Sequence, residues 1–138
     1  MLDQLLTTLP LLLTGLVLGG MTFFGFVFAP LVFAKLPADT AGGFIRQVFP
    51  VYYRVFAIVC ALAALAAWGR LDAAVLALVT AGFLFAWLWL MPRINQARDS
   101  AAEDAASGTR FARLHRLSVL INAAQLVAVL IVFVRLAG

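Results

Sequence analysis

No charged side chain occurs in the sequence between Asp3 and Lys35. A helix needs about 20 apolar residues to cross the hydrocarbon core of a bilayer, so this run exceeds one straight crossing. We therefore expect a first membrane-spanning helix that is tilted, extends beyond the bilayer, or breaks at Gly19–Gly20. The whole chain supports a membrane environment, because 65% of its residues are hydrophobic and only 12% are charged. A soluble domain of this size exposes too much surface to hide so many apolar side chains.

Three further apolar runs follow, separated by charged residues and turn residues. The predicted spans are residues 5–34, 49–69, 73–92 and 117–135. The turn Gly69–Asp72 is too short for anything except an antiparallel hairpin. We predict an all-α fold in which residues 1–138 form one domain, an antiparallel bundle of four transmembrane helices.

Prolines and capping residues predict the structure of the two connections at one end of this bundle. Pro30 and Pro37 bracket the exit of the first helix, because a proline disfavours helical conformation in the residue before it. Asp39 then caps a short helix that ends at Pro50 and lies in the membrane interface between the first two spans. In the connection 93–116, Ser107–Thr109 predicts a break between two helical halves.

The distribution of Lys and Arg predicts the orientation of the bundle. One end carries most of the basic residues, namely Lys35, Arg46, Arg54, Arg93, Arg98, Arg110, Arg113 and Arg116. The other end carries only Arg70 and Arg135. All loops are short enough for the positive-inside rule. We expect both termini outside and the connections 35–50 and 93–116 in the cytoplasm, where basic side chains meet anionic lipid headgroups.

Polar side chains form one stripe on the predicted fourth helix. His115, Ser118, Asn122 and Gln125 are spaced three, four and three residues apart, which places them on one helix face. At about 1.5 Å per residue, Gln125 lies near the bilayer midplane. Side-chain amides at that depth must face the bundle or a wet cavity, because lipid offers them no hydrogen bonds.

Further polar residues belong to the same half of the bundle. Asn95 and Asp99 share a face of the third helix, and Arg54 lies in the first turns of the second span. Together with the stripe they predict a polar ligand pocket in which Asp99 pairs with Arg54 or Arg98. The alternative is that the stripe is interhelical glue, in which each polar group contributes less than about 2 kcal/mol.

The sequence favours a non-enzymatic role. One histidine and one cysteine cannot form a closed four-ligand metal site, and bis-histidine haem ligation is excluded within one chain. Ser118 lies near His115 but lacks an orienting carboxylate. The glycine pairs lack the lysine of a phosphate-binding loop, and no nucleic-acid-binding motif occurs. We expect no cofactor, no metal site and no nucleic-acid partner.

Short motifs in chain order resemble a known family. They are Ala29-Pro30 with Phe33, Leu36-Pro37 with Ala41-Gly42, Phe49-Pro50 with Tyr52-Tyr53, Met91-Pro92 with Asn95 and Arg98, and Leu114-His115-Arg116 with Ser118 and Asn122. The ordered set covers all four spans and resembles the transmembrane protein 205 family and its bacterial relatives, grouped as the domain of unknown function numbered 4149. This resemblance implies a four-helix protein of the inner membrane in bacteria, with no established reaction, cofactor or substrate.

Three functional hypotheses follow from these features. The first is a membrane protein whose cytoplasmic-side pocket binds a small ligand or lipid, or helps to transport it. The second is an accessory or scaffold subunit of a larger membrane complex, or a homo-oligomer, that docks through the GxxxG pair Gly15 and Gly19. The third, a metal- or haem-linked redox protein, lacks histidines on the first three helices.

Overall fold

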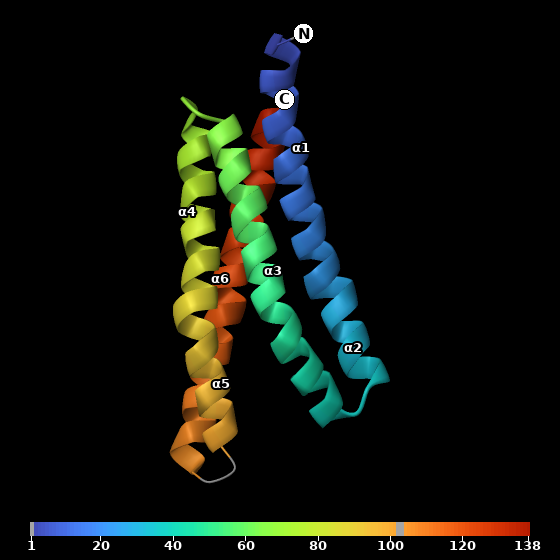
Figure 1. The fold of residues 1–138 in the computed structure, drawn as a ribbon, viewed down its shortest axis with the longest axis vertical. Helices are drawn as coiled ribbons and strands as arrows, with labels where there is room; N and C mark the ends of the chain where they lie inside the picture. Colours follow the sequence, from blue (N-terminus) through green and yellow to red (C-terminus); the bar gives the residue numbers. More distant parts are fainter. Residues whose placement is uncertain (1, 102–103) are drawn as a thin grey trace.

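Four long helical rods form an antiparallel bundle with both termini at one end (Figure 1). The computed structural model describes residues 2–101 and 104–138, and side chains from Thr7 onward. Each rod is long and apolar enough to cross a membrane: Thr7–Lys35, Ala38–Ala66, Leu71–Ser100 and Ala105–Ala137. The prediction of an all-α, multi-pass membrane protein with four spanning helices is therefore confirmed.

The first rod is one continuous structure with a widened turn near its end. It consists of α1 (Leu2–Phe23), a π-helical turn (η1, Phe24–Phe28) and α2 (Ala29–Lys35). The helix runs through Gly19–Gly20 without a break and also passes Pro30. In the π-turn the Ala29 N–H donates to the Phe24 carbonyl, five residues back. The rod ends only at Leu36, whose backbone is extended before Pro37, as expected for a residue preceding proline.

The second rod corrects the prediction of a separate interfacial helix. Residues Ala38–Ala66 form one helix, α3, which passes through Pro50. The N-terminal cap is Pro37, and Asp39 lies in the first turn, where its charge favours the positive end of the helix dipole. The helix continues because Ala41 and Ile45 are buried on the same face as the tyrosines further along, so packing offsets the one hydrogen bond that proline removes.

The third and fourth rods complete the bundle. The third consists of α4 (Leu71–Phe85), a second π-turn (η2, Ala86–Leu90) and α5 (Met91–Ser100). It follows α3 through the predicted tight hairpin, in which Gly69 has a φ of +84° that favours glycine.

The fourth rod is α6 (Ala105–Ala137), and it corrects the predicted break at Ser107–Thr109. Asp104 caps α6 by accepting hydrogen bonds from the backbone N–H groups of Ala106 at 3.1 Å and Ser107 at 3.2 Å. The cap places the start of the helix before the Ser-Gly-Thr sequence, which therefore lies in its first turns. Residues 102 and 103 of the predicted connection lie outside the described residues.

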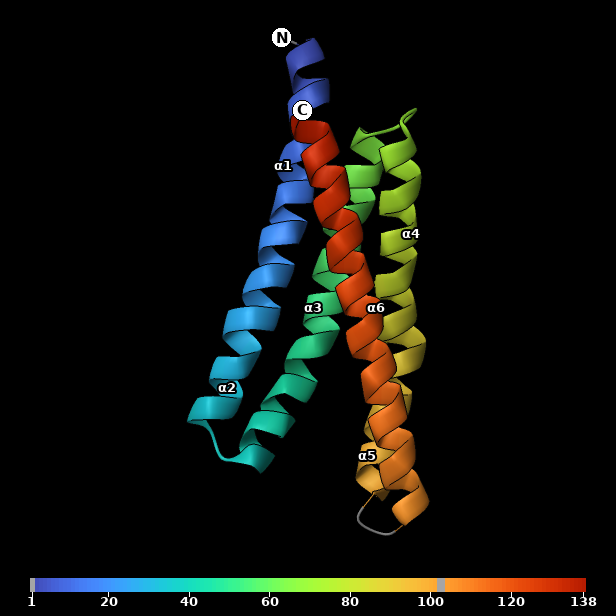
Figure 2. The ribbon, with the colours of Figure 1, turned by 180° about the vertical axis from the view of Figure 1, so that it is seen from behind.

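Packing holds the rods together at the end that carries the termini. There α3 packs against α1 and α4, and α6 packs against α1 and α4 (Figures 1 and 2). An ion pair between Arg135 Nε and Asp72 Oδ1, 2.8 Å long, joins α6 to α4. Toward the other end the α2–α3 hairpin diverges from the α5–α6 hairpin, as Figure 2 shows. We call this the basic end. It carries the α2–α3 connection and the α5–α6 connection, together with eight of the ten basic residues of the chain.

Candidate functional site

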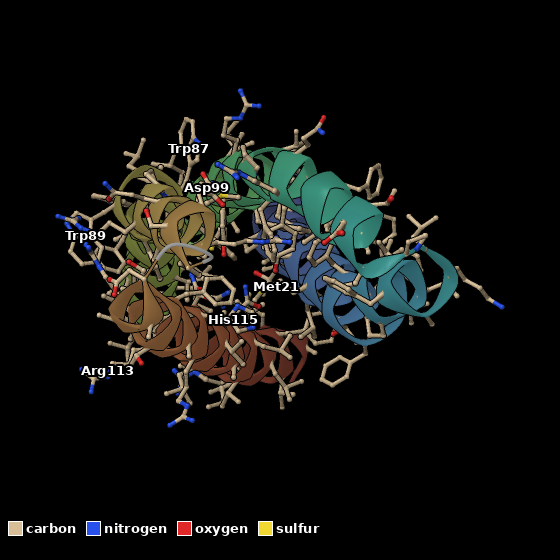
Figure 3. All side chains as sticks on the ribbon, turned by 90° about the horizontal axis from the view of Figure 1, so that it is seen from below. Met21, Trp87, Trp89, Asp99, Arg113 and His115 are labelled. Carbon is tan, nitrogen blue, oxygen red and sulfur yellow. The ribbon has the colours of Figure 1, made fainter. Side chains whose placement is uncertain are left out.

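Two connected cavities lie between the diverging hairpins at the basic end. The larger has a volume of about 460 Å³ and the smaller about 320 Å³. Both cavities are lined by Ala29, Phe49, Tyr53, His115 and Ser118. Figure 3 views the bundle from this end: His115 points toward the centre between the helices, whereas Arg113, Trp87 and Trp89 project from the periphery. Volumes of this size are typical of sites for small molecules.

The larger cavity combines polar groups with apolar walls. Its polar lining residues are Arg46 from α3, Asn95 and Arg98 from α5, and His115 and Ser118 from α6. The remaining walls are mostly apolar, formed by Phe33, Ile45, Phe49, Leu90, Met91, Ile94 and Phe111. His115 stacks on Phe111 with ring centroids 5.8 Å apart, and the Ser118 hydroxyl donates to the His115 carbonyl at 2.7 Å.

The smaller cavity is more apolar and opens sideways. It continues toward the middle of the bundle along η1 and α6, where Met21, Phe24 and Leu126 line it. On its outer side it is flanked by Phe26 and Val119, whose exposed fractions are 70% and 53%. In a bilayer these exposed side chains face lipid, so the opening connects the cavity to the hydrocarbon phase.

A bidentate ion pair bridges the two hairpins at the mouth of the larger cavity. Arg46 Nη1 donates to Asp99 Oδ1 at 2.7 Å, and Arg46 Nη2 donates to Asp99 Oδ2 at 2.9 Å. Asp99 was predicted to pair with Arg54 or Arg98, and this prediction was wrong. Arg54 lies two turns further along α3, where its guanidinium donates to the Pro50 carbonyl at 3.1 Å and stacks over the Trp87 ring.

Tyr53 is the buried polar residue that both cavities share. Its side chain is only 6% exposed, yet its hydroxyl forms no hydrogen bond with any residue that the structure describes. Neighbouring Tyr52 differs, because its hydroxyl and the Asn122 side-chain amide lie within 3.4 Å of each other. The hydroxyl oxygen itself is not fully buried, so water or a ligand in the cavity can form a hydrogen bond with it.

Arg98 reaches across from α5 to the backbone of α3. Its guanidinium occupies the space that a side chain at the buried Gly42 would fill. Within residues 2–101 and 104–138 it forms no hydrogen bond or ion pair, although it lies close enough to favour the charge of Asp99. Arg98 therefore contributes to the cavity wall a guanidinium that no described residue binds through a hydrogen bond or ion pair.

The structure brings together most, but not all, of the residues in the predicted pocket. Asn95, His115 and Ser118 line the larger cavity, Asn122 lines the smaller one, and Asp99 lies at the mouth in its pair with Arg46. Arg54 and Gln125 lie outside both cavities. Gln125 is buried between helices, where its Nε2 donates to the Val79 carbonyl at 2.9 Å.

Arg46 lines the larger cavity but was not among the residues of the predicted pocket. Gly42, Arg46, Phe49 and Tyr53 follow one another at intervals of four, three and four, so they share one face of a helix. That pattern identifies Arg46 only if residues 39–50 continue the second span. The prediction of a separate helix ending at Pro50 concealed it.

The comparisons with known proteins identify one matching family. Residues 12–103, two thirds of the chain, match a family described as a domain of unknown function (DUF4149). Neither the curated proteins nor the solved structures contain a match. The match spans the first three helical rods, including α5 and both π-turns. The chain therefore belongs to the DUF4149 family of membrane proteins.

Proposed function

We propose that this protein binds a small amphipathic molecule, such as a lipid, in the two connected cavities and that its role is binding or transport rather than catalysis. The observation that supports this proposal most directly is the arrangement of the cavity lining. Polar side chains gather at the basic end, and apolar walls continue from them to a sideways opening. Such a cavity matches a molecule with one polar end and one hydrocarbon end, delivered from the lipid phase.

We infer that the basic end faces the cytoplasm. Eight of the ten basic residues lie there, and short loops with this bias remain on the cytoplasmic side. The cavity mouth then lies at the level of the inner leaflet, where a lipid can enter with its headgroup beside the polar residues.

The proposal is tested by filling the junction of the cavities. Ala29 lines both, so Ala29→Trp should block them, whereas Ala34→Trp places the same side chain at an exposed site of the same helix that lines neither. Purified protein is illuminated in vesicles that contain photoactivatable phosphatidylglycerol or phosphatidylcholine, and the labelled peptides are mapped. We expect labelling at the peptides of Tyr53 and Asn122 in the native protein and in Ala34→Trp. Equal labelling of Ala29→Trp at these peptides would refute the proposal.

An accessory role in a larger membrane complex is the second candidate. Gly19 and Gly25 on the first rod have open space where a side chain would project, so a partner helix can approach closely there. Crosslinking in native membranes followed by purification tests this role. Recovery of the bare chain under all crosslinking conditions would reject it.

A further inference from the structure

The charge balance at the cavity mouth identifies the chemistry of the ligand's polar end. Arg46 is bound in bidentate fashion by Asp99, so these two charges cancel. The other cation of the described cavity lining is Arg98, and it has no hydrogen-bonded counterion among the described residues. The mouth therefore carries a guanidinium that no described carboxylate binds through a hydrogen bond or ion pair.

Arg98 is an exposed residue, but the tip of its side chain lies in a space that the fold provides. Its guanidinium lies against α3 because Gly42 has no side chain, and Gly42 is itself buried. Two neutral polar residues belong to the same lining, Asn95 one turn earlier on α5 and Tyr53 on α3. Both lack hydrogen-bond partners among the described residues. A guanidinium beside a side-chain amide and a phenol can bind a phosphate or carboxylate oxygen.

The route into the cavity indicates where this anion comes from. The smaller cavity leads from Tyr53 and Ser118 to the sideways opening beside Phe26 and Val119, which is suited to a hydrocarbon chain. A free phosphate ion has no need of that apolar extension. We propose that the ligand is an anionic phospholipid whose headgroup phosphate binds Arg98, with one acyl chain in the smaller cavity. This inference rests on the proposed function.

The experiment compares two photoactivatable lipids that differ only in headgroup. Native protein in vesicles should incorporate phosphatidylglycerol at the Tyr53 and Asn122 peptides about tenfold more than phosphatidylcholine. Both lipids carry the phosphate, but the quaternary ammonium of choline offsets its charge, whereas phosphatidylglycerol brings a net negative charge to Arg98. Arg98→Gln should abolish this preference while labelling by phosphatidylcholine persists. Gly42→Ala should do the same with the arginine retained, because the added methyl group displaces the tip of a flexible side chain and leaves the helix intact.

Matched controls separate the cavity from general surface charge. Arg113→Gln removes a cation of the same end that projects outward (Figure 3), and Gly43→Ala adds a methyl group where nothing lies within 4 Å. Both should keep the full preference. A preference retained by Arg98→Gln or Gly42→Ala, or lost equally in Arg113→Gln, would overturn the assignment of Arg98.

Two further outcomes distinguish this inference from the proposed function. If both lipids were incorporated equally and Ala29→Trp still blocked them, the inference of an anionic headgroup would be overturned. The proposal of lipid binding would remain. Labelling of the cavity peptides by neither lipid would remove both. Sodium phosphate added at constant ionic strength should not compete; if it displaced phosphatidylglycerol, the site would be one for a free anion and the lipid assignment would fail.

Discussion

Gln125 illustrates how a polar residue at bilayer depth is used inside a small bundle. Its side chain is 6% exposed, and its Nε2 donates to the Val79 carbonyl, which joins α6 to α4. It fits there because Gly82 has no side chain; a methyl group at that position would come within 2.8 Å of Nε2. The Oε1 atom is buried and has no hydrogen-bond partner in the described part of the chain. Gln125 therefore behaves as interhelical glue with one polar atom unsatisfied.

This arrangement makes a prediction for Gln125→Met. The substitution removes one interhelical hydrogen bond, of about 0.6 kcal/mol in a membrane, and also removes a buried unpaired acceptor, which costs about 1–3 kcal/mol. The gain exceeds the loss, so we expect the free energy of unfolding in SDS titrations to rise by about 0.4–2.4 kcal/mol. Lipid labelling of the cavity should not change, because Gln125 lines neither cavity. Loss of labelling with an intact fold would place this residue in the site.

At the scale of the helices, four of the five prolines lie within the helical rods, Pro37 being the N-terminal cap of α3, and two of these four follow a π-turn. Pro30 follows η1 and Pro92 follows η2, whereas Pro10 and Pro50 lie within α-helical segments. A proline clashes with the carbonyl four residues earlier, and a wider preceding turn relieves that clash. The same two turns contribute Phe24 and Leu90 to the cavity walls. The widened turns therefore shape the cavity as well as accommodate the prolines.

The glycines of α1 provide a matched test of which face of that helix packs inside the bundle. A side chain at Gly15 would meet the Phe133 ring at 3.1 Å, whereas one at Gly19 would meet nothing within 4 Å. Gly15→Leu should therefore destabilise the bundle by about 1–3 kcal/mol through overpacking. Gly19→Leu should leave the free energy of unfolding unchanged in detergent. An equal loss in both variants would contradict the packing of α1 on α6.

The ion pair between Arg46 and Asp99 holds the two hairpins at a defined separation. Its side chains are 39% and 58% exposed, so we expect breaking it by Asp99→Asn to change stability by less than about 1 kcal/mol. Spin labels attached at Gln47→Cys and Gln96→Cys should nevertheless show a broader distribution of distances in Asp99→Asn. Pulsed electron paramagnetic resonance measures this distribution. The buried Cys60 should not take up label.

Exchange of the two charges is the control for this pair. Arg46→Asp combined with Asp99→Arg should restore a narrow distance distribution, because it recreates the attraction with its direction reversed. A distribution that stays narrow in Asp99→Asn would show that helix packing alone sets the separation.

At the scale of the whole molecule, the basic residues gather at the end where the hairpins diverge. The proposed orientation predicts that this end is shielded from the outside of the cell. A membrane-impermeant maleimide should label Gly138→Cys in intact spheroplasts, and Gly43→Cys only after the membrane is permeabilised. Both positions are exposed, so access to reagent is the variable being measured. The reverse pattern would invert the orientation and place the cavity mouth in the outer leaflet.

The sequence by itself determined the number of spanning helices, their antiparallel order and the half of the bundle that holds the polar groups. This follows because backbone groups in lipid must be satisfied within each segment, so long apolar runs have helix as their one solution. Local patterns also placed Asn95, His115, Ser118 and Asn122 on cavity-facing surfaces.

Only the tertiary structure decided which charges meet and where the cavities lie. Asp99 pairs with Arg46 rather than Arg54 because the fold brings Arg46 beside α5, whereas Arg54 stacks over Trp87 and donates to the Pro50 carbonyl. Arg46 and Arg54 both lie on α3, so local pattern cannot choose between partners that are more than 40 residues away in the chain. Tertiary packing also decides the positions of Gln125 and Arg98, because each side chain occupies space that a glycine in the opposing helix leaves open. Gln125 there joins two helices, and Arg98 lines the cavity without a hydrogen-bonded partner among the described residues.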